Sequence, residues 1–198
     1  MKHIITILSI ASLFFVSCSR DHESENSSPA QKIYESEKLF IPVEIDLPSN
    51  LPKGNTRVAT FFAEGVQKYK ARIKPGSIPE TLEWTFVAPQ ADLYDAMNKF
   101  VGTHSAGPNW QLTGGADLIF AQAYTPPKTA PSPDPSSIDW LLLRVKDGTT
   151  PTGLFATVSY IQRIATKGGK APATLPLTIN DTVEVPYTAV YRFTQKNQ

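Results

Sequence analysis

Residues 183–194 read VEVPYTAVYRFT and carry the clearest secondary-structure pattern of the chain. Valine, tyrosine, alanine and phenylalanine occupy every second position, and mostly polar residues stand between them. A period of two predicts a β-strand with one buried face. Pro186 has no N–H to donate to a neighbouring strand, so we expect this strand to lie at a sheet edge or to bulge there.

Further short segments with strand character precede this one, separated by glycine, proline and asparagine turns. We expect strands over residues 57–62, 66–73, 82–86, 111–113, 116–118, 138–145 and 153–165, with a hairpin turn at Gly114-Gly115. Residues 90–100 fit a helix or a hairpin, and the flanking prolines favour the hairpin. The sequence predicts an all-β, single-domain antiparallel β-sandwich or barrel of about nine or ten strands within residues 33–198.

Proline is concentrated in residues 125–137, TPPKTAPSPDPSS, which contain five of the 17 prolines. Such a composition predicts an extended, semi-rigid surface loop without a core of its own. A ligand for a proline-recognition module is the alternative interpretation. We expect the simple surface connection.

The N-terminus has the pattern of a secretory signal. A basic start, Met1-Lys2-His3, precedes an apolar run over residues 4–16, which is too short to span a bilayer. The run ends in FVSC, residues 15–18, which resembles the lipobox of bacterial lipoproteins. The resemblance implies a signal peptide over residues 1–17 and acylation of Cys18. An ordinary signal peptide beside a chance cysteine is the alternative.

Residues 18–32 contain almost no apolar side chains after the cysteine, and they predict a flexible tether. Acidic residues at Asp21, Glu23 and Glu25 resemble the surface-export signals of Bacteroidetes lipoproteins. We therefore expect a lipid-anchored protein of the bacterial cell envelope. The expected place is the outer membrane, on its periplasmic or surface face, with the membrane as partner through Cys18.

The composition of the chain excludes several kinds of partner and of functional site. The chain has 19 Lys+Arg against 18 Asp+Glu, which gives no electrostatic reason to expect a nucleic-acid partner. One cysteine excludes an intrachain disulfide and a cysteine-based metal cluster. His104 is the only histidine after the tether, so no histidine-based metal site can form. Nucleophile-elbow, P-loop and dinucleotide-binding motifs are absent, and we expect no cofactor.

The candidate site lies in residues 102–110, GTHSAGPNW. His104 and Trp110 could form part of a pocket for a glycan or another small polar ligand. His104 could instead serve as a general base oriented by Asp92 or Asp95. The plainest interpretation is a hydrogen-bonded histidine at a strand end, with Trp110 in the core.

Gln162 and Arg163 form a polar pair inside the apolar 153–165 segment. Such a pair faces a pocket, faces solvent or satisfies neighbouring carbonyl groups. With His104 and Trp110, these two residues complete the set of candidate ligand-binding side chains.

A series of short motifs, in this order, resembles one known family. The motifs are GVQxY at 65–69, WxFxAPxAxL at 84–93, GxHxAGPxW at 102–110, WLLL at 140–143, YIQR at 160–163, TxGGxAP at 166–172 and VPYxAxYxF at 185–193. They resemble the uncharacterised family DUF3455, found in secreted bacterial and fungal proteins, over about residues 60–194. The resemblance implies a secreted β-rich domain and supplies no activity.

One departure from the family pattern concerns cysteine. In that pattern cysteine often occurs near Ala71 and near Pro176, and this chain has neither. If those cysteines pair in relatives, the resemblance implies that residues 66–73 lie near the 172–176 loop.

Three functions remain open at this point. The expectation is a non-enzymatic envelope lipoprotein that binds a small-molecule or glycan ligand. The alternatives are a hydrolase or isomerase using His104 with a carboxylate, and a structural or assembly protein acting through an exposed strand edge. Whether His104, Trp110 and Arg163 line one cavity separates these hypotheses.

Overall fold

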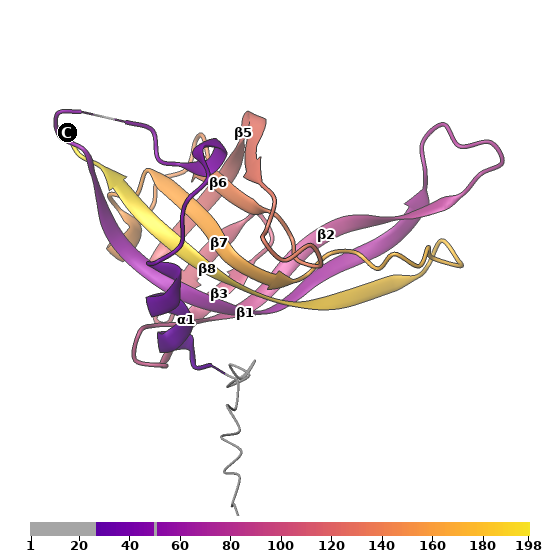
Figure 1. Cartoon of the computed structure of the whole chain (residues 1–198), viewed down its shortest axis with the longest axis horizontal. Helices are drawn as coiled ribbons and strands as arrows, with labels where there is room; N and C mark the ends of the chain where they lie inside the picture. The colour runs from indigo at the N-terminus through magenta and orange to yellow at the C-terminus, as the bar shows by residue number, and fades with distance from the viewer. Residues whose placement is uncertain (1–26, 50) are drawn as a thin grey trace, which may run out of the picture.

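The computed structural model describes residues 27–49 and 51–198, and over these ranges it is a closed β-barrel of eight antiparallel strands. Each strand pairs with the next in sequence, and the last pairs with the first (Figure 1). The strands are β1 (Asn55–Ile73), β2 (Leu82–Tyr94), β3 (Phe100–Ser105), β4 (Asn109–Leu112), β5 (Leu118–Ala130), β6 (Trp140–Val145), β7 (Tyr160–Gly168) and β8 (Thr182–Lys196). The predicted all-β fold is confirmed, and it is a barrel.

The strand number is slightly below the predicted nine or ten because separate predicted segments merge. Residues 57–62 and 66–73 belong to one 19-residue strand, β1. The hairpin favoured for residues 90–100 is confirmed, since β2 ends at Tyr94 and β3 begins at Phe100. Its turn is held by Asp95, whose carboxylate accepts hydrogen bonds from the backbone N–H groups of Met97 and Lys99.

Three strands are longer than the barrel and project from it as an arm (Figure 1). β7 pairs with β8 only as far as Tyr187, and β3 pairs with β2 only as far as Ala91. We call the strand segments beyond these pairs, residues 66–73, 82–90 and 182–186, the arm. Pro186 lies in the arm, where β8 pairs with β1 alone, so the expected edge position is confirmed.

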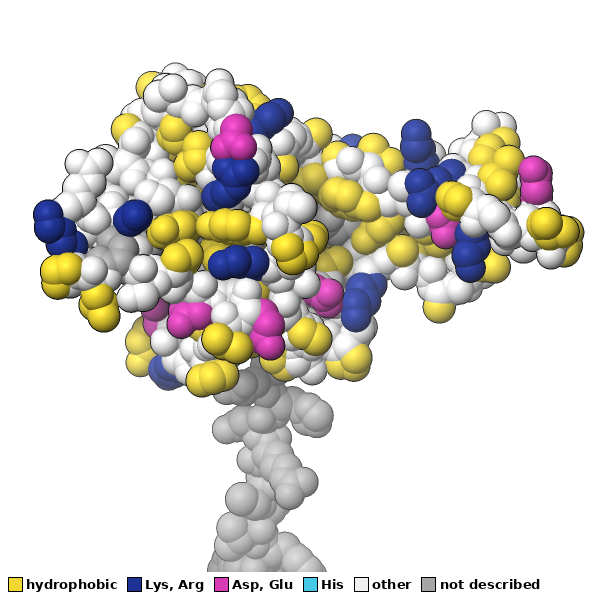
Figure 2. All heavy atoms as spheres, turned by 90° about the horizontal axis from the view of Figure 1, so that it is seen from above, with side chains coloured by type: hydrophobic (Ala, Val, Ile, Leu, Met, Phe, Trp, Pro, Cys, Tyr) yellow, Lys and Arg dark blue, Asp and Glu magenta, His cyan; other side chains and the backbone are white. Residues whose placement is uncertain are grey.

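The loop of residues 170–181 runs along the arm. The Trp84 indole Nε1 donates to the Thr174 carbonyl oxygen at 2.8 Å, and the Ala71 N–H donates to the Asp181 carbonyl oxygen at 2.8 Å. Several apolar side chains of the arm and of this loop are exposed, and Figure 2 shows hydrophobic side chains interspersed with lysine and arginine over the arm. The arm therefore keeps apolar surface in contact with solvent.

The barrel interior is filled by the odd-numbered positions of β8 and by their counterparts on the other strands. Aromatic rings dominate one region, where Phe61, Phe155 and Phe193 meet with centroid separations of 4.8–6.4 Å. Phe155 comes from a 3₁₀ turn, η2 (Gly153–Phe155), which inserts its side chain into the core with no solvent exposure. Residues 153–159, predicted as strand, precede β7 as this turn and a connecting segment.

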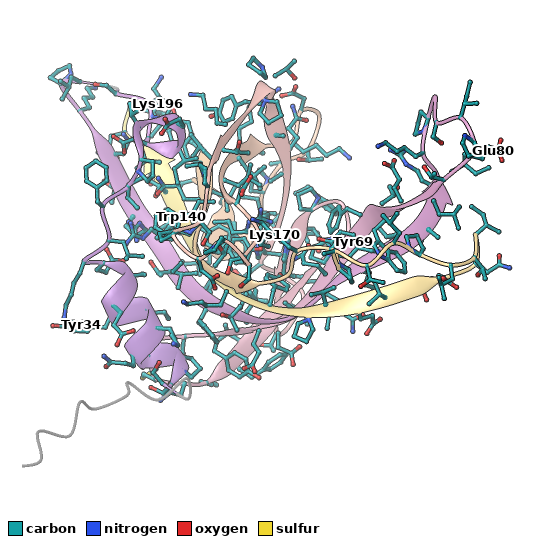
Figure 3. All side chains as sticks on the ribbon, turned by 45° about the vertical axis from the view of Figure 1, so that its right-hand side comes forward. Tyr34, Tyr69, Glu80, Trp140, Lys170 and Lys196 are labelled. Carbon is teal, nitrogen blue, oxygen red and sulfur yellow. The ribbon has the colours of Figure 1, made fainter. Side chains whose placement is uncertain are left out.

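The N-terminal segment, residues 29–47, covers the outer face of the barrel as a strap. It contains the helix α1 (Pro29–Ser36) and the 3₁₀ turn η1 (Val43–Ile45), and α1 begins inside the predicted tether. Its apolar side chains pack on even-numbered positions of β1 and of β5 to β8. The buried members of this outer cluster are Ile33, Ile45, Phe62, Ala130, Trp140, Leu142, Ile164 and Val190. Figure 3 shows Trp140 on the strap side of the barrel.

A buried arginine fastens the strap to the barrel. The Arg192 guanidinium donates to the Ser36 carbonyl oxygen at 2.7 Å and forms an ion pair with Glu37 at 3.2 Å. The strap explains why WLLL is apolar on both faces, because β6 is covered inside by the core and outside by residues 29–47. The predicted signal peptide and Cys18 lie outside the described residues. None of the described helices is long and apolar enough to cross a membrane.

The proline-rich segment differs from the predicted loop in its first half, because β5 continues to Ala130. The β5–β6 register jumps from Ala123–Leu143 to Lys128–Leu142, so residues 124–127 bulge out of the ladder. Pro126 and Pro127 lie in this bulge, where missing N–H donors cost no ladder bonds.

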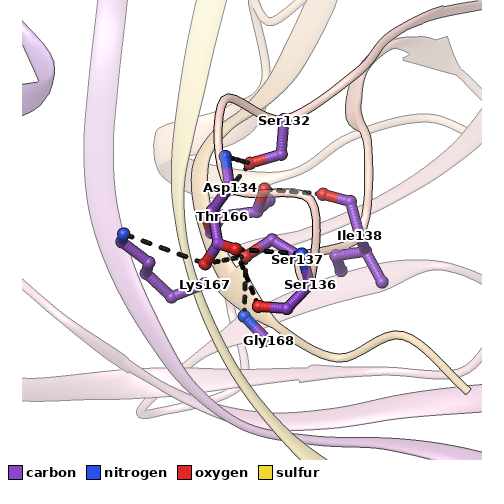
Figure 4. A network of polar contacts seen from close by, with 8 residues as sticks. All are labelled: Ser132, Asp134, Ser136, Ser137, Ile138, Thr166, Lys167 and Gly168. Carbon is purple, nitrogen blue, oxygen red and sulfur yellow. Dashed lines mark hydrogen bonds and ion pairs between the residues drawn. The ribbon is translucent and has the colours of Figure 1, made fainter. Parts of the chain in front are cut away.

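The second half of that segment is fixed by Asp134 (Figure 4). Its carboxylate accepts hydrogen bonds from the Ser136 N–H and hydroxyl and from the Ser137 hydroxyl, and these bonds lower the Asp134 pKa to about 2. The Ser137 hydroxyl in turn accepts from the Gly168 N–H at 2.8 Å. The loop is therefore bound to the end of β7.

Candidate functional site

A cavity of about 320 Å³ opens at the end of the barrel where the arm departs. Seven of the eight strands contribute to its wall, and only β5 does not. The described residues that line it are Gln67, Phe86, Val87, Ala88, Pro89, His104, Ala106, Gly107, Pro108, Trp110, Leu141, Leu143, Arg163 and Tyr191. Three of the four candidate ligand-binding residues, His104, Trp110 and Arg163, therefore lie on one cavity.

His104 is held between aromatic rings. Its imidazole stacks on the Trp110 indole at 4.4 Å with an interplanar angle of 8°, and the Tyr191 ring approaches at 5.0 Å. The His104 Nδ1 lies 2.8 Å from the Asn109 carbonyl oxygen. Because a carbonyl oxygen only accepts, Nδ1 carries the proton of the neutral ring and Nε2 is left with a lone pair.

Burial controls the protonation of this ring. Only 3% of His104 is exposed, and loss of solvation lowers its pKa from 6.5 to about 4. The hydrogen bond to Asn109 opposes this shift, and the nearby Arg163 charge adds to it. At neutral pH His104 is therefore an uncharged side chain with one fixed tautomer.

This pKa makes stability depend on pH. The unfolded chain binds a proton at His104 from about pH 6.5 downward, whereas the folded chain binds it only near pH 4, so acid favours the unfolded state. We expect His104 to lower the free energy of unfolding by about 2 kcal/mol between pH 7.5 and pH 5. His104→Asn, which keeps an N–H donor but does not titrate, should lose this contribution in urea titrations across that range. Identical pH slopes for both proteins would contradict a neutral buried His104.

Arg163 brings a positive charge to the cavity. It is at an inward-facing position of β7, and its Nε and Nη2 atoms donate to the Asp139 carbonyl oxygen at 3.2 and 2.8 Å. That oxygen is uncharged, and no Asp or Glu is present among the described residues that line the cavity. Within the described ranges, Arg163 forms no ion pair with a carboxylate.

Polar side chains of β1, β7 and β8 meet beside the cavity. The Tyr191 hydroxyl has the Tyr187 hydroxyl and the Arg163 guanidinium as hydrogen-bonding neighbours, and Gln67 is such a neighbour of Tyr187. Burial raises the pKa of Tyr191, so its hydroxyl keeps its proton. Nε1 of Trp110 is buried without a hydrogen-bond partner and has almost no surface that a molecule in the cavity could touch. Arg163 is therefore the charged side chain that the cavity offers to a ligand.

Gln162 is not part of the cavity. Successive side chains of a strand point to opposite faces, so Gln162 faces outward where Arg163 faces inward. Its Nε2 atom donates to the Ile45 carbonyl oxygen of the strap at 2.8 Å. Of the alternatives weighed for this residue, it satisfies a neighbouring carbonyl group.

The carboxylates considered as partners for His104 also lie elsewhere. Asp95 is bound to its own turn, and Asp92 is exposed, with Ala91 and Leu93 on either side of it buried. Neither lines the cavity. Within the described ranges, no group of three or more His, Cys, Asp or Glu side chains is arranged to hold a metal ion.

Sequence reasoning did not select Gln67 and Tyr191. Tyr191 belongs to the inward stripe of β8, where it could not be distinguished from ordinary core residues. Gln67 carried a usable signal, because it is a polar residue at a position that shares a face with Phe61 and Ala63. Its importance became visible only when barrel closure placed β1 beside β8.

Comparison with known proteins adds the family. A family model described as "Protein of unknown function (DUF3455)" matches residues 52–195, which span the barrel and the arm. The chain belongs to the DUF3455 family. No curated protein and no solved structure matches this DUF3455 chain. Because the family description names no activity, the function of this DUF3455 protein has to be argued from the cavity.

Proposed function

We propose that this protein is a non-enzymatic, membrane-anchored envelope lipoprotein whose barrel cavity binds a small polar ligand. The observation that carries the proposal is the convergence of His104, Trp110 and Arg163 on one cavity whose described lining has no carboxylate to pair with Arg163. A polar ligand bound to the guanidinium would supply that partner.

The size and lining of the cavity define what fits. At about 320 Å³ it lies at the lower end of the range for ligand pockets, roughly 300–1,000 Å³. One face of the Trp110 indole is covered by His104, so a sugar has no access to that face. Phe86 at the rim is 50% exposed and offers a ring for stacking. A glycan would therefore enter by one terminal unit and extend over Phe86.

The arrangement supports binding rather than turnover. His104 turns its protonated nitrogen to a backbone carbonyl and has no carboxylate to orient it. The described lining contains no serine, threonine, cysteine or lysine to act as a nucleophile. A histidine with a pKa of about 4 is also a weak base at neutral pH.

The anchor is the second part of the proposal. Lipidation of Cys18 would hold the barrel at the bacterial envelope, with the segment before α1 as the tether. Cells fed an alkyne-labelled fatty acid should label the wild-type protein and leave Cys18→Ser unlabelled. Equal labelling of both proteins would contradict acylation of Cys18.

A ligand screen by thermal shift tests the binding function. Ala106 lies at the cavity rim, so Ala106→Trp should obstruct the entrance, whereas Ala96→Trp adds the same side chain to the distant β2–β3 turn. We expect at least one envelope-type small molecule to raise the melting temperature of the wild type and of Ala96→Trp but not of Ala106→Trp. Compounds that raise the melting temperature of all three proteins equally do not bind in the cavity. A screen that finds only such compounds would refute the proposal.

A further inference from the structure

We propose that the ligand of the cavity is a small organic acid, held by its carboxylate on Arg163 with its apolar body against the opposite wall. This inference rests on the binding function proposed above and specifies the chemical class of the ligand.

The described lining of the cavity carries positive charge and no negative charge. Arg163 is the only cationic side chain among the described lining residues, no lining residue is acidic, and His104 is neutral above about pH 4. The half-buried Arg163 guanidinium donates to the neutral Asp139 carbonyl and pairs with no carboxylate of the described residues, so it lacks a counter-ion. A single negative charge on the ligand supplies it.

The Arg163 guanidinium is also the strongest hydrogen-bond donor in the cavity wall. It is planar and carries five N–H groups, and its Nε and Nη2 atoms lie 3.2 and 2.8 Å from the Asp139 carbonyl oxygen. A carboxylate has two acceptor oxygens in one plane, which suits the planar guanidinium.

The rest of the wall is apolar. Val87, Pro89 and Pro108 lie at the arm and at the β3–β4 turn, and Leu141 and Leu143 come from β6. Such a surface accommodates a hydrocarbon or aromatic body. Inorganic phosphate has no such body and carries more charge than one arginine balances. The single positive charge and the apolar wall together favour an organic acid with one carboxylate.

The charge test compares matched ligands by calorimetric titration at pH 7. Benzoate and phenylacetate carry the carboxylate, benzamide keeps the shape of benzoate without the charge, and inorganic phosphate keeps charge without the apolar body. We expect benzoate or phenylacetate to bind at least about tenfold more tightly than benzamide and phosphate, with affinity falling as salt is added. Failure of both carboxylates to bind, or benzamide or phosphate binding as tightly as the better one, would overturn the inference.

Substitutions at Arg163 test whether this side chain binds the carboxylate. Arg163→Met should weaken binding of the better carboxylate at least about tenfold, whereas Arg144→Met, which removes an exposed arginine paired with Asp147, should not change it. Equal affinities of these two variants would also overturn the inference. Arg163→Lys keeps the charge without the planar fork and should bind with intermediate affinity. If Arg163→Met does not fold, a lysine variant as tight as the wild type would contradict recognition by the guanidinium plane.

Different results would refute the proposed binding function and the proposed organic-acid ligand. A neutral compound that stabilises the wild type and Ala96→Trp but not Ala106→Trp, together with weak carboxylate binding, overturns the organic-acid inference and leaves the binding function standing. If no compound of either class discriminates Ala106→Trp from Ala96→Trp, both proposals are refuted.

Discussion

Trp110→Ala should lower the free energy of unfolding by about 3–5 kcal/mol, the largest effect that we expect from a single side-chain truncation in this protein. The Trp110 indole is fully buried and packs against Tyr191 and Phe193 with ring centroids 5.1 and 5.5 Å apart. It also supports the stacked His104 ring. Removing it leaves a cavity that the rigid barrel wall cannot close. Urea unfolding followed by circular dichroism measures the loss.

Trp84→Ala is the matched control. Trp84 lies in the arm, where it is half-buried and its Nε1 donates to the Thr174 carbonyl oxygen. Its truncation removes a hydrogen bond and partial packing outside the barrel core, so the loss should be about 1–2 kcal/mol. If the two variants lose the same stability, Trp110 is not the central packing residue of the barrel.

Gly65→Ala should cost about 3 kcal/mol, because β1 and β2 approach too closely there for any side chain. A Cβ atom at Gly65 would lie 2.1 Å from the Gln90 carbonyl oxygen and 2.5 Å from the Ala91 Cα. Both atoms belong to the backbone of β2 and cannot rotate away, so the ladder has to open. Because Gly65 lies two residues before Gln67, we expect the cavity wall to shift as well.

Gly76→Ala separates this steric effect from the general cost of replacing glycine. Gly76 lies in the loop at the end of the arm with nothing within 4 Å of its added Cβ, but its φ of +75° disfavours alanine. That conformation alone should cost about 1 kcal/mol. Thermal and urea unfolding of both variants should give the larger loss for Gly65→Ala, and the reverse order would contradict the close approach of β1 and β2.

Local periodicity in the sequence was enough to predict much of this fold. The alternation in residues 183–194 identified β8 and its inward face, and the proline flanks identified the β2–β3 hairpin. The closure of β8 onto β1 could not be predicted, because strand pairing between chain ends leaves no local pattern. The strap could not be predicted because the apolar side chains of residues 29–47 follow no regular period of two and bury only against the outer barrel face.

The sequence predicted those residues of the candidate site whose type is uncommon in their surroundings. His104 attracted attention as the only histidine after the tether, and Arg163 as a charge within an apolar strand. Gln162 could not be separated from Arg163 until the face of β7 was known, since neighbouring residues point to opposite sides. Gln67 and Tyr191 become part of the site through tertiary contacts, which the sequence does not display.

Ligand binding in the cavity can be followed at the indole N–H signal of Trp110 in ¹⁵N-resolved NMR spectra during a titration with benzoate. The chain has three tryptophans, and Trp84 and Trp140 serve as internal references in the arm and under the strap. We expect a saturable shift of the Trp110 signal alone, because its indole lines the cavity that benzoate occupies. An unchanged Trp110 signal at benzoate concentrations that saturate the calorimetric titration would contradict binding of the acid in the barrel cavity.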